Sequence, residues 1–181
     1  EFFHGEGYQN PPAMSEYTFT RIKFRDYQRH GQDEFAFYKE MCMHCNEPAC
    51  ASVCPVAAFF KTEEGPVTYR PERCIGCRYC MIACPYNARY FNYLENPEWP
   101  NKDFPRRSHG VAESCTFCAH RLDEGLQPAC VEACQNANRG ALIHGDLNDP
   151  NSEVARLVAE APVKRIRDDW GTEPKVFYLG L

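Results

Sequence analysis

The chain has 181 residues, a formal net charge of −5 and twelve cysteines. This length suits one compact domain or two small halves, and the mildly acidic balance gives no electrostatic signature of nucleic-acid binding. The longest uninterrupted apolar run, Val53–Phe60, is too short to span a bilayer, and no signal peptide is visible at the start. The number of cysteines is therefore the most informative feature of the composition.

The N-terminal part of the chain precedes the first cysteine. Residues 1–16 are rich in aromatic residues, Gly and Pro, which indicates an irregular arm lying on another surface or a disordered tail. Tyr17–Phe24 alternates in the manner of a strand. We expect a polar loop over Arg29–Glu34 and a second strand over Glu34–Lys39 that leads directly into the first cysteine run.

Two cysteine runs follow. Cys42–Pro55 has the spacing C-x2-C-x4-C-x3-C-P, and Cys74–Pro85 has C-x2-C-x2-C-x3-C-P. The second spacing is the bacterial ferredoxin signature of a [4Fe–4S] cluster, in which the fourth cysteine ligates the other cluster. We therefore expect two clusters with crossed ligand sets. Cluster A takes Cys42, Cys45, Cys50 and Cys84, and cluster B takes Cys54, Cys74, Cys77 and Cys80.

Zinc and disulfide bonds are the alternative explanations of these cysteines. Structural zinc uses pairs of C-x2-C knuckles, which does not account for a third cysteine, a fourth and then a proline. Six disulfides would suit a small secreted scaffold with few other core residues, whereas this chain has ample apolar content. His44 lies inside the first knuckle, either as a ligand or, as we expect, as a neighbour that tunes the cluster.

The segments after each run repeat one pattern. A β-hairpin is predicted before Cys74, with strands over Val56–Lys61 and Val67–Arg70 and a turn over 62–66. Tyr86–Tyr93 is the corresponding returning strand of the second half. This repeat of knuckle, short helix and hairpin predicts a pseudo-twofold pair of cluster-binding halves.

A third cysteine set follows a long irregular loop. The loop, Asn92–Gly110, contains the pair Arg106-Arg107, which we expect to be solvated, with a partner contact as the alternative. A helix is expected over Thr116–Glu124, with Gly125 as its C-terminal stop. The third set has the spacing C-x2-C-x11-C-x3-C and consists of Cys115, Cys118, Cys130 and Cys134.

The C-terminal part predicts a helix from the N-cap Ser152 to about Ala161, whose apolar face packs in the core, and then an apolar strand or arm over Pro174–Leu179. The fold class is therefore α+β: a ferredoxin-like double cluster-binding core with short strands, short helices and long irregular loops. We expect five segments: an N-terminal arm with strands (1–41), the paired core (42–93), a connecting loop (94–114), the third cysteine segment (115–145) and a C-terminal helix with an arm (146–181).

Three motifs now support a resemblance. The first motif is C-x2-C-x4-C-x3-C-P at Cys42–Pro55. The second is C-I-G-C-x-Y-C-x2-A-C-P-Y at Cys74–Tyr86. The third is C-x-F-C-x2-R-x4-G-x2-P-A-C-V-x-A-C at Cys115–Cys134. With them, the chain resembles the iron–sulfur electron-transfer subunits of dimethyl sulfoxide reductase-type membrane complexes. The tail, which includes Gly171–Leu179, is similar to that of the subunits of nitrite, tetrathionate, polysulfide, arsenate and Dsr complexes.

The chain departs from the family pattern in three ways. The family has a further ligand run upstream of Tyr17, Gln135 stands where a proline is expected, and Asn136–Arg139 looks like an insertion. In the family, the upstream run shares two clusters with the third set. The cysteine count favours three clusters, with Cys134 closing the third. A fourth cluster is the alternative if residues before Glu1 carry the missing run.

The resemblance implies a role without catalysis. A cluster bound by four thiolates has no open iron site and serves as a one-electron carrier. The resemblance implies a relay between a catalytic subunit, such as a molybdenum or tungsten bis-pterin enzyme, and a membrane quinone-reacting subunit or cytochrome. It implies a place at the periplasmic or extracytoplasmic face through these partners, with the cytoplasm as the alternative. The rival function is a free soluble polyferredoxin.

Overall fold

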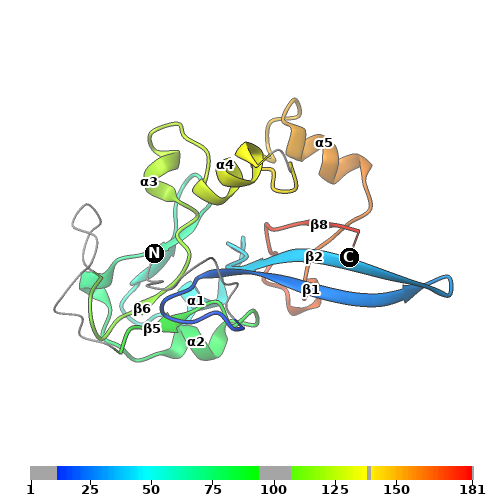
Figure 1. The fold of residues 1–181 in the computed structure, drawn as a ribbon. Coiled ribbons are helices and arrows are strands. Elements are labelled where there is room, and N and C mark those ends of the chain that lie inside the picture. The colour runs from blue at the N-terminus through cyan, green and yellow to red at the C-terminus, as the bar shows by residue number, and fades with distance from the viewer. Residues whose placement is uncertain (1–11, 94–106, 138–139, 181) are drawn as a thin grey trace.

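The computed structural model describes residues 12–93, 107–137 and 140–180. Its strands form two-stranded antiparallel sheets, and its helices are short (Figure 1). This is the α+β class that the sequence predicts. The expectations for residues 1–11, 94–106 and 138–139, Arg106 among them, lie outside the described residues.

A long antiparallel hairpin projects from one side of the molecule (Figure 1). It consists of β1 (Thr20–Arg29) and β2 (Gln32–Met41), paired along their whole length. The predicted loop over Arg29–Glu34 was wrong, because His30 and Gly31 alone make the turn with φ of 53° and 77°. Positive φ at both central residues defines the type I′ turn, whose twist matches that of the flanking strands. The strands therefore continue through the polar residues.

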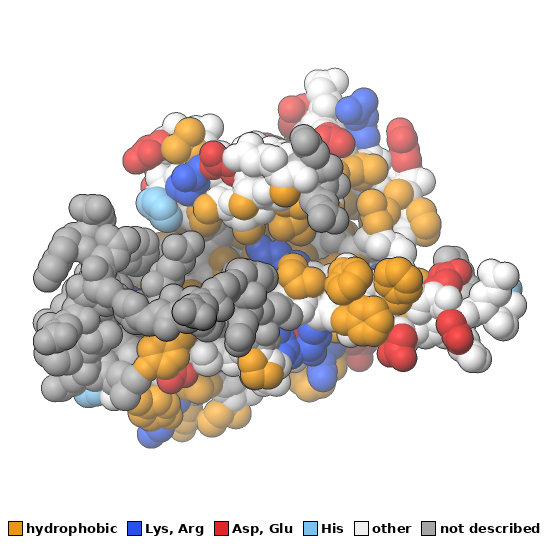
Figure 2. Space-filling model, viewed as in Figure 1, with side chains coloured by type: hydrophobic (Ala, Val, Ile, Leu, Met, Phe, Trp, Pro, Cys, Tyr) orange, Lys and Arg blue, Asp and Glu red, His pale blue; other side chains and the backbone are white. Residues whose placement is uncertain are grey.

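The two faces of this hairpin have different surroundings. Phe24 lies opposite Phe37 in the register, and both rings, with that of Phe35, are between 60% and 68% exposed. Figure 2 shows apolar side chains gathered on this part of the molecule. On the other face, Tyr38 packs edge-on against Tyr178 of the C-terminal strand, with ring centroids 6.0 Å apart. One face is thus covered by the chain itself, and the aromatic face is open.

The two cysteine runs fold into similar halves. In the first half, α1 (Ala49–Ser52) is followed by a hairpin of β3 (Phe59–Lys61) and β4 (Val67–Tyr69), as predicted. A 3₁₀ turn, Pro71–Arg73, leads into the second half. There, α2 (Tyr79–Ala83) is followed by β5 (Tyr90–Phe91), which pairs with β6 (Ala112–Glu113). The returning strand is shorter than predicted, and its partner lies within the segment expected to be the connecting loop.

The cysteines themselves make up much of the buried core. One cluster of buried side chains surrounds the first knuckle, and its members are Cys42, Met43, Cys45, Cys84, Tyr86, Ala88 and Tyr178. The other lies between the two halves and consists of Cys50, Phe59, Val67, Cys80 and Ala112. Thiol sulfurs from both runs therefore lie in apolar surroundings, where free thiolates would be unfavourable.

Two short helices carry the third cysteine set. They are α3 (Ala119–Leu122) and α4 (Ala129–Asn136). The first is shorter than predicted, because Phe117 and Cys118 adopt left-handed φ values of 58° and 53° and cannot continue a right-handed helix. Gly125, with φ of 73°, follows this helical segment, as the sequence predicts.

The C-terminal helix α5 (Glu153–Glu160) begins as predicted, since the Ser152 hydroxyl accepts a hydrogen bond of 3.1 Å from the Ala155 amide. The prediction that its apolar face packs in the core was wrong. Val154 and Leu157 are only half-buried, and no residue of α5 is fully buried. The helix lies at the periphery (Figure 1), so it covers less of the molecule than its amphipathic pattern suggests.

The last part of the chain forms a small two-stranded sheet. β7 (Val163–Lys164) pairs with β8 (Tyr178–Leu179), and the 3₁₀ turn Asp168–Trp170 lies between them. The hydroxyl of Tyr178 donates a hydrogen bond of 2.7 Å to the carbonyl of Lys39 at the end of β2. β8 is thereby held against the end of β2, which leads into the first cysteine run.

One predicted surface side chain, that of Arg107, is partly buried and pairs with a buried carboxylate. Arg107 pairs with the carboxylate of Glu113, which is only 2% exposed, and its guanidinium lies 5.1 Å from the ring centroid of Phe19. The expectation that Arg107 is solvated was therefore wrong. The physical reason is that Glu113 is drawn into the interior by the β5–β6 pairing and requires a cation there.

Candidate metal centre

The three C-x2-C knuckles share one backbone conformation. The residue before the second cysteine has positive φ in each: His44 at 43°, Gly76 at 70° and Phe117 at 58°. Glycine adopts this conformation without strain, whereas a side chain disfavours it. In the third knuckle, the turn points the amide of Phe117 at the sulfur of Cys115, 3.4 Å away. The shared geometry shows that the third set contains the same kind of knuckle as the two ferredoxin runs.

The two Cys-Pro turns also match each other. The amide of Ala58 donates to the sulfur of Cys54 at 3.2 Å, and that of Ala88 donates to the sulfur of Cys84 at 3.5 Å. Asn87 has φ of 51°, and the corresponding residue of the first turn has φ of 48°. The internal repeat expected from the sequence is therefore present in the backbone. Amide donors of this kind stabilise negative charge on a ligand sulfur.

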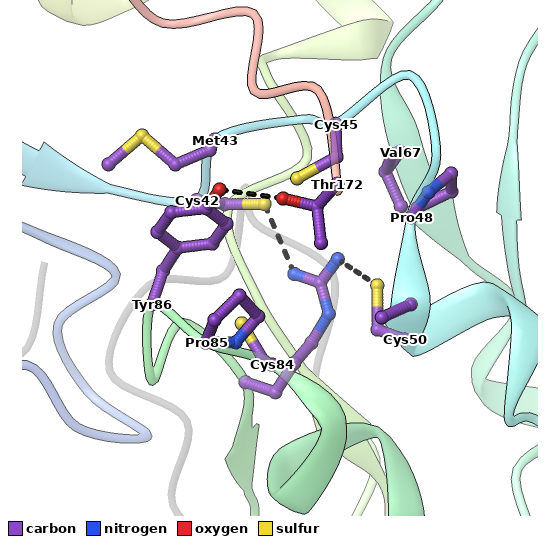
Figure 3. A pocket seen from close by; sticks show the side chains of 12 residues that line it. Cys42, Met43, Cys45, Pro48, Cys50, Val67, Cys84, Pro85, Tyr86 and Thr172 are labelled. Atoms are coloured by element: carbon purple, nitrogen blue, oxygen red, sulfur yellow. Dashed lines mark hydrogen bonds between the residues drawn. The ribbon is translucent and has the colours of Figure 1, made fainter. Parts of the chain in front are cut away.

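Four cysteines from both runs line a single pocket (Figure 3). Three come from the first run, and the fourth, at the end of α2, comes from the second run; they are Cys42, Cys45, Cys50 and Cys84. These are the four residues that the cysteine spacing assigns to cluster A. The assignment of ligands remains a prediction, but the chain brings the four thiols to one place.

Arg89 extends into this pocket, although no sequence motif singles it out. Its guanidinium donates to the sulfur of Cys42 at 3.2 Å and to that of Cys50 at 3.0 Å (Figure 3). It also lies 4.6 Å from the ring centroid of Phe59 and is only 3% exposed. The sequence contains one signal of this residue: an arginine within the largely apolar and aromatic stretch that follows Pro85.

Three thiols of the pocket, those of Cys42, Cys45 and Cys50, have shifted pKa values. Burial raises the pKa of Cys42, but the charges of Arg89 and His44 outweigh burial and lower it to about 5. Burial raises the pKa of Cys45 to about 11, against a hydrogen bond from Thr172 that lowers it. Burial also raises the pKa of Cys50, and Arg89 opposes the rise. Buried thiols next to a fixed cation fit a metal cluster, because iron replaces the thiol protons and compensates the thiolate charge.

His44 is buried beside the pocket. Its Nδ1 accepts a hydrogen bond of 3.0 Å from the amide of Val67, and its ring lies 4.7 Å from that of Phe117 in the third knuckle. Burial lowers the pKa of His44, while the sulfurs of Cys42 and Cys115 raise it to about 9. The Val67 amide opposes protonation, because an imidazolium has no acceptor nitrogen. The two sulfurs and the Val67 amide therefore act on the protonation of His44 in opposite directions.

The C-terminal segment closes the pocket, which the sequence did not indicate. The carbonyls of Thr172 and Glu173 accept hydrogen bonds from the amides of Glu47 and Asn46 at 3.1 and 2.9 Å. The hydroxyl of Thr172 lies 2.7 Å from that of Tyr86 (Figure 3). A segment that lies more than one hundred residues beyond the first cysteine run in the sequence thus forms one wall of the cysteine pocket.

Two of the cysteines assigned to cluster B belong to the second buried cluster: Cys80 is a member, and Cys74 packs against it. Burial raises the pKa of Cys80 to about 12; the charge of Arg89 opposes this rise, and the charges of Cys50, Cys74 and Cys54 add to it. The sulfur of Cys74 accepts from the amide of Ala112 at 3.5 Å. Cys77, the remaining member of the set, is exposed.

The third set is less closely gathered. Cys115 packs against the core cluster around Cys42, and Cys118 caps α3. Cys130 and Cys134, four residues apart on α4, share one face of that helix. No hydrogen bond joins these two to the Cys115 knuckle within the described residues. Across 12–93, 107–137 and 140–180, no three His, Cys, Asp or Glu side chains are close enough to hold a single metal ion.

Comparison with known protein families gives two matches. Residues 34–99 and residues 73–138 each match a family described as a 4Fe-4S dicluster domain. The two matches share residues 73–99, which contain the second cysteine run. Together with the twelve cysteines, they indicate at least two [4Fe–4S] clusters and allow three.

Curated relatives agree with these matches. The chain is 47% identical over 150 residues to an Hdr-like menaquinol oxidoreductase iron–sulfur subunit 1 of Archaeoglobus fulgidus, covering 78% of this chain and 56% of the relative. It is 40% identical over 166 residues to a tetrathionate reductase subunit of Salmonella typhimurium, covering 90% and 60%. It is 33% identical over 201 aligned positions to the arsenate respiratory reductase iron–sulfur subunit ArrB of Shewanella sp. ANA-3, covering 92% and 80%. The chain thus spans less than two thirds of the length of the first two.

Proposed function

The chain belongs to the family of [4Fe–4S] iron–sulfur subunits of oxidoreductase complexes, and on that premise we propose that it relays single electrons between a catalytic subunit and a membrane partner. The observation that supports this relay most directly is the pocket in which Cys84 of the second run joins Cys42, Cys45 and Cys50 of the first. Crossed ligand sets are the arrangement of two-cluster ferredoxins.

The ligand sets follow the cysteine runs. Cluster A is held by Cys42, Cys45, Cys50 and Cys84, cluster B by Cys54, Cys74, Cys77 and Cys80, and a third cluster by Cys115, Cys118, Cys130 and Cys134. When bound, such clusters supply reversible one-electron oxidation and reduction, and with four thiolates each they leave no iron open to substrate. We assign no catalytic residue to this chain.

The protein residues around these sites perform the remaining tasks. The C-terminal segment excludes water from the cluster A pocket, and the amides of Ala58 and Ala88 donate to ligand sulfurs. His44 lies between Cys42 and Cys115, and Cys50 and Cys80 share one buried cluster. These contacts support an order in which cluster A stands between cluster B and the third cluster.

The partners are inferred from the relatives. Those relatives include subunits of reductases for tetrathionate, arsenate and polysulfide, and an iron–sulfur subunit of a menaquinone reductase. We propose that this chain docks a catalytic subunit, such as a molybdenum or tungsten bis-pterin enzyme, and a quinone-reacting membrane subunit or cytochrome. In the described part of the chain, no helix has the length and hydropathy needed to cross a membrane. An extracytoplasmic place through these partners is part of the proposal, with the cytoplasm as its alternative.

The alternative function is a free soluble polyferredoxin. The open aromatic face of the β1–β2 hairpin, formed by Phe24, Phe35 and Phe37, favours the subunit over the free carrier (Figure 2). Contiguous exposed aromatic rings of this kind mark interaction surfaces. A tagged chain that co-purifies with larger subunits, and loses them when Phe24 and Phe37 are both replaced by Ser, supports the subunit. A chain that purifies alone from its native cells supports the free carrier.

Iron and acid-labile sulfide per chain test the cluster assignment directly. On anaerobically purified protein we expect about twelve irons, from three four-iron clusters, and EPR signals of reduced clusters after dithionite treatment. About eight irons would leave only clusters A and B, and about sixteen would mean that ligands outside this sequence hold a fourth cluster. Zinc in place of iron would refute the electron-transfer function.

A further inference from the structure

Arg89 is a buried cation that donates hydrogen bonds to two cysteine sulfurs and, at 3.2 Å, to the carbonyl of Ala88. Its side chain is 3% exposed, and its two terminal nitrogens donate to Cys42 and Cys50 at 3.2 and 3.0 Å. The remaining nitrogen, Nε, is buried without a hydrogen-bond partner. Among the described residues, no Asp or Glu forms an ion pair with Arg89. The sulfurs of cluster A are therefore its counter-charge.

Such a charge stabilises one redox state over the other. Reduction adds one electron to a four-thiolate cluster, and a guanidinium stabilises the added negative charge. Net charge, hydrogen bonds to sulfur and burial are the protein's means of setting the potential of an iron–sulfur cluster, and Arg89 contributes all three. Coulombic interaction at this range is strong because the site is buried and only weakly screened.

We propose that Arg89 sets the reduction potential of cluster A, raising it so that the cluster between the two others accepts an electron more readily. This inference rests on the proposed function, because it requires that Cys42, Cys45, Cys50 and Cys84 hold cluster A. The residue touches the ligand sulfurs and takes no part in bond formation. Its effect is on how the reducing electron distributes along the relay.

The chain offers a matched control in Arg70. Its guanidinium lies 4.3 Å from the ring centroid of Phe60, as that of Arg89 lies 4.6 Å from the ring centroid of Phe59. Arg70, however, is exposed. Arg70→Gln therefore removes the same charge and a similar stacking contact from a solvated position, where screening reduces its influence.

The test is EPR-monitored redox titration of the holoprotein, with the cluster A signal identified by its change in a Cys45→Ser variant. In Arg89→Gln, we expect the reduced-to-oxidised ratio of cluster A at fixed potential to fall about tenfold, which corresponds to about 59 mV for one electron. Arg70→Gln keeps the wild-type ratio. Arg89→Lys, which keeps a positive charge, stays closer to wild type than Arg89→Gln.

Iron content separates the outcomes. Full iron with an unchanged cluster A potential in Arg89→Gln overturns the inference, as does an equal shift in Arg70→Gln. If Arg89→Gln loses the cluster A irons, a loaded Arg89→Lys with a nearly wild-type potential supports the role of charge. If Arg89→Lys also loses the cluster A irons, the inference is overturned, because Arg89 then acts through packing and not through its charge. Wild-type protein without these irons would refute the proposed function itself, independently of any Arg89 variant.

Discussion

The hydrogen bond between Tyr86 and Thr172 determines how firmly the C-terminal segment closes the cluster A pocket. The two hydroxyls are 2.7 Å apart, and the residues are 8% and 6% exposed. Thr172→Val leaves the buried Tyr86 hydroxyl only the sulfur of Cys45, a weak acceptor, and removes the Thr172 hydroxyl that also hydrogen bonds to Cys45. We therefore expect the closed state of the segment to be destabilised relative to an opened state in which water reaches the pocket.

The magnitude follows from burial. An unsatisfied buried hydroxyl costs about 1–3 kcal/mol, so the opened population rises about 5- to 150-fold. Tyr86→Phe should have a similar effect, because each hydroxyl keeps only the sulfur of Cys45 as a partner when the other hydroxyl is removed. The double variant Tyr86→Phe/Thr172→Val should lie closer to wild type than the sum of the single variants, because replacing both partners by apolar groups leaves no orphaned hydroxyl on Tyr86.

The assay is the rate at which holoprotein loses its clusters to an iron chelator, followed by visible absorbance, with EPR to identify the cluster lost. Cluster A should be lost faster in Thr172→Val, whereas Tyr79→Phe, at an exposed tyrosine, should leave the rate unchanged. Equal rates in Thr172→Val and wild type would refute the closing role of the segment. Strictly additive effects in the double variant would refute the coupling between the two hydroxyls.

Two further predictions concern residues around the second run. Arg107→Met should leave the carboxylate of Glu113 buried and unpaired, and should destabilise the protein by about 3–5 kcal/mol, measured as a lower denaturant midpoint. The double variant Arg107→Met/Glu113→Met should recover most of this lost stability. A double variant as unstable as Arg107→Met would contradict the reasoning. Gly76→Ala should destabilise the second knuckle by about 1–2 kcal/mol from its left-handed φ, and more from the approach of the new methyl group to the carbonyl of Gly110 at 3.0 Å. We expect faster loss of cluster B than of cluster A in Gly76→Ala, and equal losses would argue against a local effect.

The cysteine chemistry can be predicted from the sequence because it depends on the local spacing of the cysteines. A knuckle, a one-turn helix and a Cys-Pro turn each span only a few residues, so the order of the cysteines fixes what each can bind. The spacing predicts [4Fe–4S] clusters, which the family matches bear out, and the internal repeat, which reappears in the turns after Cys54 and Cys84. The ligand assignments remain predictions of the same reasoning.

Errors in the predicted elements have local physical causes. The hairpin loop was placed over Arg29–Glu34 because its residues are polar, but a two-residue type I′ turn lets polar residues pair as strands. The helix expected from Thr116 begins later because the knuckle conformation at Phe117 and Cys118 takes precedence over helix propensity. The amphipathic pattern of α5 predicts a core helix, but the apolar face of α5 is only half-buried.

The surroundings of the candidate clusters were decided by tertiary structure. In the sequence, Arg89 is one arginine among many. The fold places its guanidinium within hydrogen-bonding distance of the sulfurs of Cys42 and Cys50. Thr172 reaches the pocket because the segment between β7 and β8 hydrogen bonds to the first knuckle. Spacing along the chain determines which atoms can bind a cluster. The charge, hydrogen bonding and solvent access of that cluster depend on contacts between residues far apart in sequence, and these exist only in the folded chain.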